Sequence, residues 1–576
     1  MYEAFEWMVP IVTRLYPGLA DRLRAVGIRV YPKAYAGMVG FWLLVTTATT
    51  LIISIAIFLT GVGLLISTAL LITPSIIFLI LLYYPSIMAT NVKAGIEAET
   101  PYLASYLSVM STGGIPPYTA LQRVAISGLM PRSSEIGRMT ELYMRARGVD
   151  QLTALETISK IVPEKEIGDL LRGYTSTVRL GGDVVHYLLR RTELIFKRRA
   201  ERVRALVDRF SILMEAYLAS SILLALGLYM MFIVSRAIPM GAGLMGLETF
   251  FTFSYLVLPF INAMFLYIAD MMQIKYPSYD VRPYYVLLLS TPAFAISLLS
   301  FFLADIFPPL ATVFSPFLQL RSFLIRALGL SPGFDAAFGL IISSLILFTP
   351  AAVYEVLNSM RERGIFSGVT SFLREVVEVR KTGISPERAI ERLAEMDFRQ
   401  FTPILRAMAN KLAWGATYQS IYEFIKRRVR NWLTKLNLFI FFDAIEVGGG
   451  TPDTLETLAR FSEEIETIES TKRSSLRPLL LIPYIGMSIL VFTSISLLGF
   501  MREILLQAGR PLAFDQFLRV FLPPIVLNSV MMGLVAGKLS EESVAAGFKH
   551  VVLILLIVVI TFVASPIIMT LFVPRT

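Results

Sequence analysis

The sequence predicts an all-α, polytopic membrane protein with about nine transmembrane helices and two homologous cytoplasmic helical-bundle domains. Three observations lead to this fold class. The 576 residues are 55% hydrophobic, with a mean hydropathy of +0.66, which exceeds the apolar content of soluble domains. Apolar runs long enough to cross about 30 Å of hydrocarbon alternate with two long charged stretches. The two charged stretches also share a repeated motif.

The apolar runs give nine expected spans. They lie at about 37–59, 64–84, 217–234, 250–268, 284–303, 336–354, 479–500, 520–536 and 551–572. The first two are separated only by a turn around Thr60, Gly61 and Gly63, so they are expected to form a hairpin. The eighth is short and contains Pro523 and Pro524. Without it, the C-terminus would lie on the other side of the membrane.

The basic residues set the expected orientation. The N-terminal segment is rich in arginine, and nine crossings from a cytoplasmic start place both charged stretches in the cytoplasm. Acidic and aromatic residues at the N-terminus are not typical of a cleaved signal. The expected parts are 1–84, the N-terminal segment and hairpin; 85–210, cytoplasmic domain 1; 211–354, spans 3 to 6; 355–477, cytoplasmic domain 2; and 478–576, spans 7 to 9.

Both charged stretches have a helical pattern. Leu103, Tyr106, Leu107 and Met110 recur at the three-and-four spacing of one helix face, and strand signals are sparse. We therefore expect both domains to be all-α bundles.

A repeated motif relates the two domains. Residues 114–125 match residues 383–394, and residues 179–183 match residues 446–450 at almost the same offset. A glycine that ends one helix in a left-handed cap, followed by a proline in the first turn of the next helix, predicts a helix–turn–helix corner used twice. The structural residues of the motif are Gly114, Pro117, Gly181, Gly182, Gly383, Pro386, Gly448 and Gly449.

This arrangement of a helix, a glycine–proline corner, a later glycine pair and a trailing apolar span resembles the type II secretion F-domain. Two such domains with about nine spans are similar to the archaeal platform proteins of the archaellum and related pili, in the TadC branch. The resemblance implies a platform in the cytoplasmic membrane that contacts a hexameric secretion ATPase and helps to assemble pilin-like or archaellin subunits into a filament. It also implies a homo-oligomer, for which we expect a dimer.

The last helices of the two repeats differ in charge. The first, at 186–210, is strongly basic, whereas the second carries a run of glutamates. The two faces are either solvated, the basic one near anionic headgroups, or they are surfaces by which the domains contact a partner or pair with each other. By analogy with the family, the candidate ATPase contacts are Arg190, Arg198, Arg202, Lys426, Arg427, Arg428, Glu463 and Glu466.

Catalytic chemistry is not expected. The chain has no cysteine, and therefore no disulfide or thiolate metal site. Its two histidines, His186 and His550, lie in separate segments, which disfavours a zinc site or a histidine-based triad. Residues 533–539 only approximate a phosphate-binding loop, because the glycines are too close and Leu539 replaces the required hydroxyl. We expect no enzyme activity, cofactor or metal.

Two other functional classes stay open. The net charge of +10 is interpreted as retention of basic loops in the cytoplasm, so no nucleic-acid partner is expected. A multi-pass transporter or channel is the alternative, although Glu215 and Asp270 lie at span ends rather than at mid-membrane. A signalling receptor or simple scaffold is the third class.

Overall fold

The computed structural model describes residues 5, 7–16, 19, 23, 31–59, 73–237, 246–277, 280–305, 308–448, 450–507 and 514–567. These residues are almost entirely helical, and none of them forms a strand. The all-α prediction is confirmed. The chain divides into two compact units, one of residues 1–195 and 274–277, and the other of residues 196–273 and 278–576.

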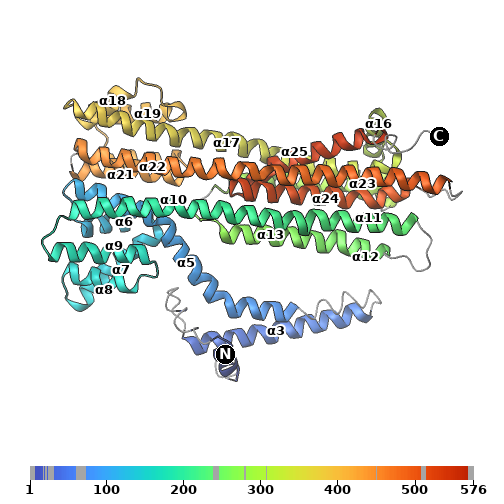
Figure 1. Cartoon of the computed structure of the whole chain (residues 1–576), viewed down its shortest axis with the longest axis horizontal. Helices are drawn as coiled ribbons and strands as arrows, with labels where there is room; N and C mark the ends of the chain where they lie inside the picture. The colour runs from blue at the N-terminus through green and yellow to red at the C-terminus, as the bar shows by residue number, and fades with distance from the viewer. Residues whose placement is uncertain are drawn as a thin grey trace. The chain divides into compact units, whose positions relative to one another are not determined.

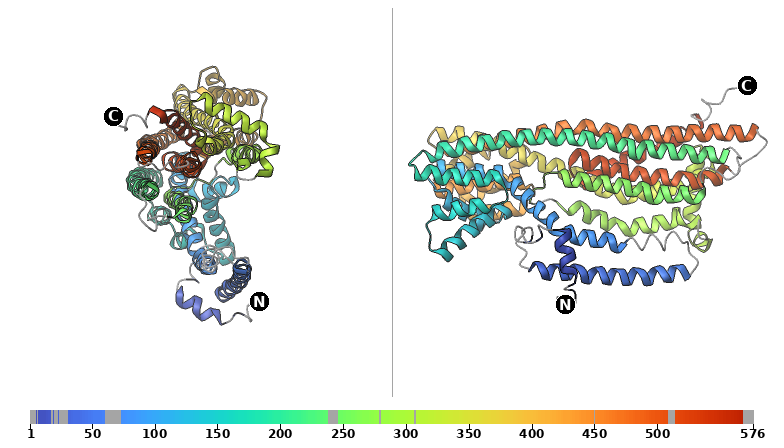
Figure 2. Two further views of the ribbon diagram at one scale, coloured as in Figure 1. Left: turned by 90° about the vertical axis from the view of Figure 1, so that its right-hand side faces the viewer. Right: turned by 60° about the horizontal axis from the view of Figure 1, so that its bottom comes forward.

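The first unit contains a pair of long helices and a bundle of shorter ones (Figure 1). Helices α3 and α5 lie side by side and antiparallel (Figure 2), and the Tyr35 hydroxyl on α3 donates a hydrogen bond of 2.6 Å to the Leu81 carbonyl on α5. The end of α5, helices α6 to α9 and the start of α10 form what we call the first helical domain. The helices are α1 (Met8–Leu15), α3 (Pro32–Leu59), α5 (Thr73–Thr112), α6 (Pro117–Ser127), α7 (Pro131–Arg147), α8 (Gln151–Ile161), α9 (Lys165–Arg179) and α10 (Val184–Tyr217).

The second unit holds most of the apolar helices and the second helical domain, which consists of the end of α17, helices α18 to α21 and the start of α22 (Figure 1). Its membrane part includes π-helices η2 (Leu218–Leu223) and η3 (Phe253–Val257). The other helices are α11 (Leu224–Ala237), α12 (Leu247–Thr252), α13 (Leu258–Met272), α14 (Arg282–Phe301), α15 (Pro308–Val313), α16 (Ser315–Ala327), α17 (Asp335–Lys381), α18 (Pro386–Leu393), α19 (Thr402–Ala413), α20 (Tyr418–Arg428), α21 (Trp432–Gly448), α22 (Pro452–Leu476), α23 (Leu481–Gln507), α24 (Phe514–Glu541) and α25 (Val544–Val563).

Eight helices among the described residues are long and apolar enough to cross a membrane. They lie within Pro32–Ile52, Val184–Ser235, Leu247–Met272, Arg282–Phe301, Pro332–Lys381, Pro452–Gln507, Phe514–Glu541 and Val544–Val563. The eighth expected span is therefore present as one continuous helix, α24, with both of its prolines inside. The turn expected at 60–63 and the first part of the span expected at 64–84 lie outside the described residues.

The two repeats share the geometry of their corners. Gly114 (φ +83°) follows α5 and Gly383 (φ +84°) follows α17. Each glycine N–H donates a hydrogen bond of 3.0 Å to the carbonyl three residues earlier. Pro117 and Pro386 are the first residues of α6 and α18. A left-handed glycine cap followed by a proline at the first helical position accounts for both corners.

The second glycine turn differs from the sequence alignment by two residues. Its left-handed residues are Gly181 (φ +69°) and Gly450 (φ +56°). Each lies 67 residues after its corner glycine, Gly114 or Gly383. The sequence pairing of Gly181 with Gly448 is therefore shifted by two residues: Gly181 corresponds to Gly450, the last of three consecutive glycines. Gly448 ends α21, and Gly449 lies outside the described residues.

Helices α24 and α25 form the most closely packed hairpin of the second unit. A Cβ atom on Gly537 would lie 2.1 Å from the backbone nitrogen of Gly547, and one on Gly533 would lie 2.5 Å from the backbone of Val551. The glycines of residues 533–539 therefore allow two helices to approach, as small residues do in membrane bundles. They belong to a helix and not to a phosphate-binding loop.

We predict that Gly537→Ala lowers the thermal unfolding midpoint of the detergent-solubilised protein. The added methyl group must separate two backbones, and overpacking of this kind costs about 1–3 kcal/mol. Gly227→Ala on α11 is the control, since a Cβ there has no atom within 4 Å. A Gly537→Ala midpoint equal to or above that of the control would contradict the close packing.

A second prediction concerns the corners. Replacing Gly383 with Val should destabilise the protein by about 1–2 kcal/mol, because a β-branched residue is strained in the left-handed region. Gly383→Asn should cost less, since asparagine tolerates this conformation. A Cβ at this position meets nothing within 4 Å, so the difference between the two variants in chemical or thermal unfolding reports backbone strain alone.

Candidate functional site

Unbroken helices connect the second helical domain to the apolar helices of the second unit. Helix α17 is one helix of 47 residues, and α22 continues through η7 (Arg477–Leu480) into α23. A group of charged and polar side chains lies where these helices meet α24 and α25. We call it the junction cluster, and it consists of Glu355, Arg363, Glu469, Lys472, Tyr484, Glu541, Glu542, Lys549 and His550.

Lys472 is at the centre of one half of the junction cluster. Its side chain is only 5% exposed, and its Nζ atom lies 2.9 Å from a carboxylate oxygen of Glu469 and 2.8 Å from one of Glu542. Glu469 is on α22, whereas Glu542 follows the end of α24 in a left-handed conformation (φ +60°). The lysine therefore ties α22 to the connection between α24 and α25.

Glu541 is at the centre of the other half. Its carboxylate accepts a hydrogen bond of 2.8 Å from Arg363 on α17 and forms an ion pair with Lys549 on α25. The Nε2 atom of His550 lies 3.5 Å from the same carboxylate, and its Nδ1 atom is 2.8 Å from the Tyr484 hydroxyl on α23. This arrangement joins α17, α23, α24 and α25.

The chemistry of the junction cluster is structural. No group of three or more His, Cys, Asp or Glu side chains in the described part of the chain is placed to hold a metal ion. The energetics of a buried ion pair are asymmetric: the intact pair contributes little net stability, but loss of one partner leaves an uncompensated charge and costs about 3–5 kcal/mol. Such a cluster fixes the relative position of the helices that it joins.

A second polar network lies among the apolar helices. The amide oxygen of Asn262 on α13 accepts hydrogen bonds from Tyr217 (2.7 Å) and Ser221 (3.2 Å), and its amide nitrogen donates one of 3.1 Å to Asn528 on α24. All four side chains are buried. Ser221 lies in π-helix η2, and π-helices are frequent at functional positions.

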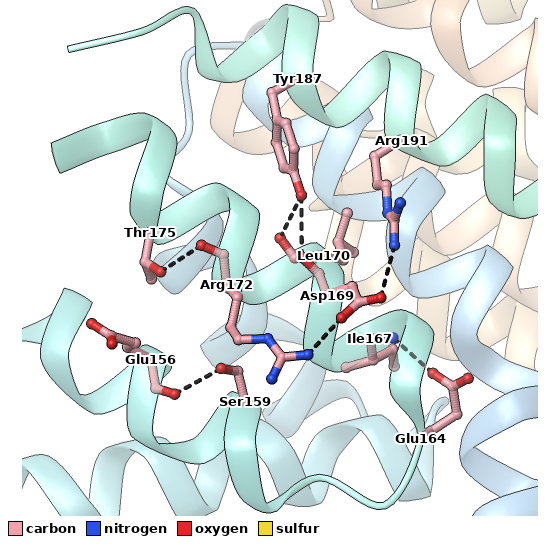
Figure 3. A network of polar contacts seen from close by, with 10 residues as sticks. All are labelled: Glu156, Ser159, Glu164, Ile167, Asp169, Leu170, Arg172, Thr175, Tyr187 and Arg191. Atoms are coloured by element: carbon pink, nitrogen blue, oxygen red, sulfur yellow. Dashed lines mark hydrogen bonds and ion pairs between the residues drawn. The ribbon is translucent and has the colours of Figure 1, made fainter. Parts of the chain in front are cut away.

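In the first helical domain, Asp169 on α9 joins this helix to α10 (Figure 3). Its carboxylate lies 2.5 Å from Arg172 on the same helix and 3.3 Å from Arg191 on α10. The Tyr187 hydroxyl of α10 donates to the carbonyls of Asp169 (3.2 Å) and Leu170 (3.3 Å). The network fixes the start of α10 on α9, and α10 is the helix that continues toward an apolar span.

A buried carboxylate organises the other side of this domain. Glu99 on α5 is fully buried and accepts hydrogen bonds from the backbone N–H groups of Arg132 (3.2 Å) and Ser133 (2.7 Å) at the start of α7. Burial raises the pKa of Glu99, and the two N–H groups oppose that shift. Glu99 thus caps a helix from a distant part of the chain.

The candidate contact residues predicted from the sequence lie on three helices, α10, α20 and α22. On α10, Arg190 and Arg198 are exposed and Arg202 is half-buried. On α22, Glu463 forms an ion pair with Arg374 of α17, and Glu466 is half-buried. The pairing with Arg374 shows that part of the acidic face of α22 serves contacts inside the second helical domain.

The third group is at the end of α20. Lys426 lies 2.9 Å from Glu423, whereas Arg427 and Arg428 are exposed. Arg428 also lies over the ring of Phe424, with its Cζ atom 5.4 Å from the ring centroid. For all eight residues, contact with the ATPase stays a prediction.

The junction cluster was not predicted from the sequence. His550, which the sequence analysis considered only as an improbable metal ligand or catalytic residue, is 5% exposed and packs against Tyr484. One feature of the sequence could have indicated the cluster. Four polar or charged residues lie close together between two apolar spans: Glu541, Glu542, Lys549 and His550. The burial of Lys472 could not be recognised from the sequence, because the residue lies in a helix with many other charged residues.

We predict that Lys472→Met destabilises the protein by about 3–5 kcal/mol, because it leaves two carboxylates without their cation. Lys381→Met is a matched control: Lys381 also contacts two carboxylates, Glu378 (3.1 Å) and Glu456 (3.4 Å), but its side chain is 45% exposed. Exposed pairs contribute about 0–1 kcal/mol. The free energy of unfolding is measured in detergent. An equal decrease in the two variants would show that Lys472 is no more important for stability than an exposed lysine.

A double variant sharpens this test. Adding Glu542→Gln to Lys472→Met should recover part of the lost stability, since one of the unpaired carboxylates is removed.

Comparison with known proteins assigns both repeats. The family described as type II secretion system (T2SS), protein F, matches residues 103–232 and again residues 372–499. An uncharacterized protein of Methanocaldococcus jannaschii is 21% identical over 504 residues, which cover 84% of this chain and 82% of the relative. No solved structure matches the chain. Both repeats therefore match the type II secretion system protein F family.

Proposed function

We propose that this protein is the membrane platform of a type IV filament, such as an archaellum or archaeal pilus, or of a type II-like secretion machine. On this platform a separate cytoplasmic ATPase drives the movement of pilin-like subunits. The platform itself is not an enzyme. The match of both repeats to this family supports the platform role.

One structural observation carries the proposal: each family domain continues into an apolar span without a break in the helix. The continuous stretches are 52 residues at Val184–Ser235 and 56 residues at Pro452–Gln507. A continuous helix transmits a displacement from one end to the other, because its backbone hydrogen bonds keep the rise per residue at about 1.5 Å. A force applied to a helical domain would then reach the membrane along these helices.

The proposed arrangement follows from this. Both helical domains, at 85–210 and 355–477, would face the cytoplasm, where the ATPase is. The spans would hold the apolar stems of filament subunits, and two copies of the chain would form a dimer. Contacts with the ATPase are proposed separately on α10, at Arg190, Arg198 and Arg202, and on α22, at Glu463 and Glu466.

Two exposed arginines of α10, Arg190 and Arg209, differ in their distance from the apolar part of the helix. Arg190 is exposed and lies 27 residues before Tyr217, where the apolar part begins, which corresponds to about 40 Å of helix. Arg209 is also exposed but lies only eight residues before Tyr217, or about 12 Å. A soluble ATPase would reach the first more readily than the second.

We predict that the detergent-solubilised protein binds the secretion ATPase of its own organism and does not hydrolyse ATP alone. The measurement is a pull-down with and without nucleotide, together with ATP hydrolysis by each component. Arg190→Glu should weaken binding about tenfold or more, because charge reversal at an interface replaces an attraction with a repulsion. Arg209→Glu, nearer the span, is the matched control. Absence of binding combined with solute flux in proteoliposomes would favour a transporter.

A further inference from the structure

The end of helix α20 lies at the boundary between the second helical domain and the apolar helices. Arg430, two residues beyond α20, donates hydrogen bonds from Nη1 to the Tyr354 hydroxyl (3.0 Å) and the Asn358 amide oxygen (2.6 Å), and it lies 3.2 Å from Asp280. Asp280 precedes α14 by two residues. Helix α20 therefore runs toward the spans and ends beside them.

The level of the membrane surface is given by α17. Its stretch from Asp335 to Tyr354 covers about 29 Å, which matches the roughly 30 Å of a hydrocarbon core. Tyr285, in the first turn of α14 and five residues after Asp280, is 65% exposed, as is typical of tyrosines in the interfacial belt. Tyr354 and Arg430 thus mark the edge of the hydrocarbon.

Three exposed arginines surround this edge, Arg361 on α17 and Arg427 and Arg428 on α20. We call them the boundary arginines. Arg361 is seven residues beyond Tyr354, or about 10 Å, close to the headgroup layer, which adds about 5–8 Å on each side of the core. The long arginine side chain can cover the remaining distance.

The carboxylates near the boundary arginines already have partners. Glu362 accepts hydrogen bonds from the backbone N–H groups of Arg430 (3.2 Å) and Asn431 (2.9 Å), Asp280 pairs with Arg430, and Glu423 pairs with Lys426. None of the boundary arginines forms an ion pair with another described residue. The charges of Asp280 and Glu423 are thus taken up by other cations. Glu362 also interacts with the charge of Arg361, but one carboxylate does not neutralise three arginines, so the patch keeps a net positive charge.

A fourth cation adds to the patch. Lys435 on α21 is half-buried. Burial lowers the pKa of Lys435, and the charge of Lys426 lowers it further, against an opposing effect of Glu362. An anion bound at this level would relieve the repulsion between these groups.

We propose that Arg361, Arg427 and Arg428 bind the phosphate groups of anionic phospholipids in the leaflet on the side of the second helical domain. Guanidinium groups form paired hydrogen bonds with phosphate oxygens. Their depth favours a lipid headgroup over a soluble protein or a nucleic acid. The first repeat has its own basic stretch on α10, so this contact gives the second domain a separate attachment to the membrane surface. The inference is independent of the proposed platform role.

Retained lipid tests this assignment. The full-length protein is reconstituted in nanodiscs with equal amounts of phosphatidylglycerol and phosphatidylcholine, extracted, and examined by native mass spectrometry. Arg427→Gln/Arg428→Gln should lower the preference for phosphatidylglycerol by about fivefold for each charge removed, since one basic residue near an anionic surface contributes about that factor. Arg427→Lys/Arg428→Lys should keep most of it.

Arg388→Gln/Arg392→Gln is the matched control, an exposed arginine pair on α18, after the end of α17 and so about 40 Å of helix beyond Tyr354. It should retain the wild-type preference. Equal preference in all variants would overturn the proposal.

Two further outcomes identify the source of the phosphate or the partner. Displacement of phosphatidylglycerol by millimolar inorganic phosphate would overturn the lipid assignment in favour of a free-anion site. An Arg427→Gln/Arg428→Gln variant that keeps its lipid preference but loses the ATPase would make the same patch a protein contact, as predicted from the sequence. Lost lipid preference with intact ATPase binding supports the inference and leaves the platform role unaffected.

Discussion

Lys472 is buried between two carboxylates at the point where the second helical domain meets the apolar helices. The rest of the second unit depends on this constraint. A buried charge must stay paired. If α22 moved relative to the α24–α25 connection, the ion pair between Lys472 and Glu542 would break and leave a buried charge without its partner. The glycine-lined contact between α24 and α25 extends the same constraint, because the two backbones are so close that neither helix can rotate or shift without a steric clash.

The two repeats have one backbone plan and different surfaces. Their corners repeat at the same spacing, with glycines at nearly equal φ values, because a left-handed cap and a proline are demanded by the turn itself. The polar contacts between helices have no such conformational requirement, so their residues can differ between the repeats. In the first repeat, Asp169 binds α10 through Arg191, whereas the acidic α22 uses Glu463 to bind α17. Duplication kept the turns and changed the charges, so a partner would distinguish the two domains.

The fold was predictable to the extent that it rests on local chemistry. Apolar runs of sufficient length give spans, and the glycine–proline corners give the repeat, so the helical class and the duplicated domain can be inferred from sequence. Lys472 could not be recognised, because its importance comes from Glu542, which is 70 residues away and joins it only after α23 and α24 have crossed between them. Asn262 and Asn528 were missed for the same reason: each is one amide in an apolar run. The pairing of Gly181 with Gly448 was wrong by two residues because the sequence has three consecutive glycines at 448–450, and only the backbone shows that Gly450 is the left-handed one.

The two connecting helices are held by interactions of different strength. Helix α22 is tied by Lys472 and its two carboxylates, where removal of one partner costs about 3–5 kcal/mol. Helix α10 enters the apolar region through π-helix η2 and meets Asn262 by neutral hydrogen bonds from Tyr217 and Ser221, each worth about 0.5–1.5 kcal/mol. The hydrogen bonds of a π-helix join residues five apart instead of four. If η2 changed to an α-helix, α11, which follows it, would therefore shift slightly. Movement of α22 would therefore separate buried charges, whereas movement of the apolar end of α10 would break neutral hydrogen bonds.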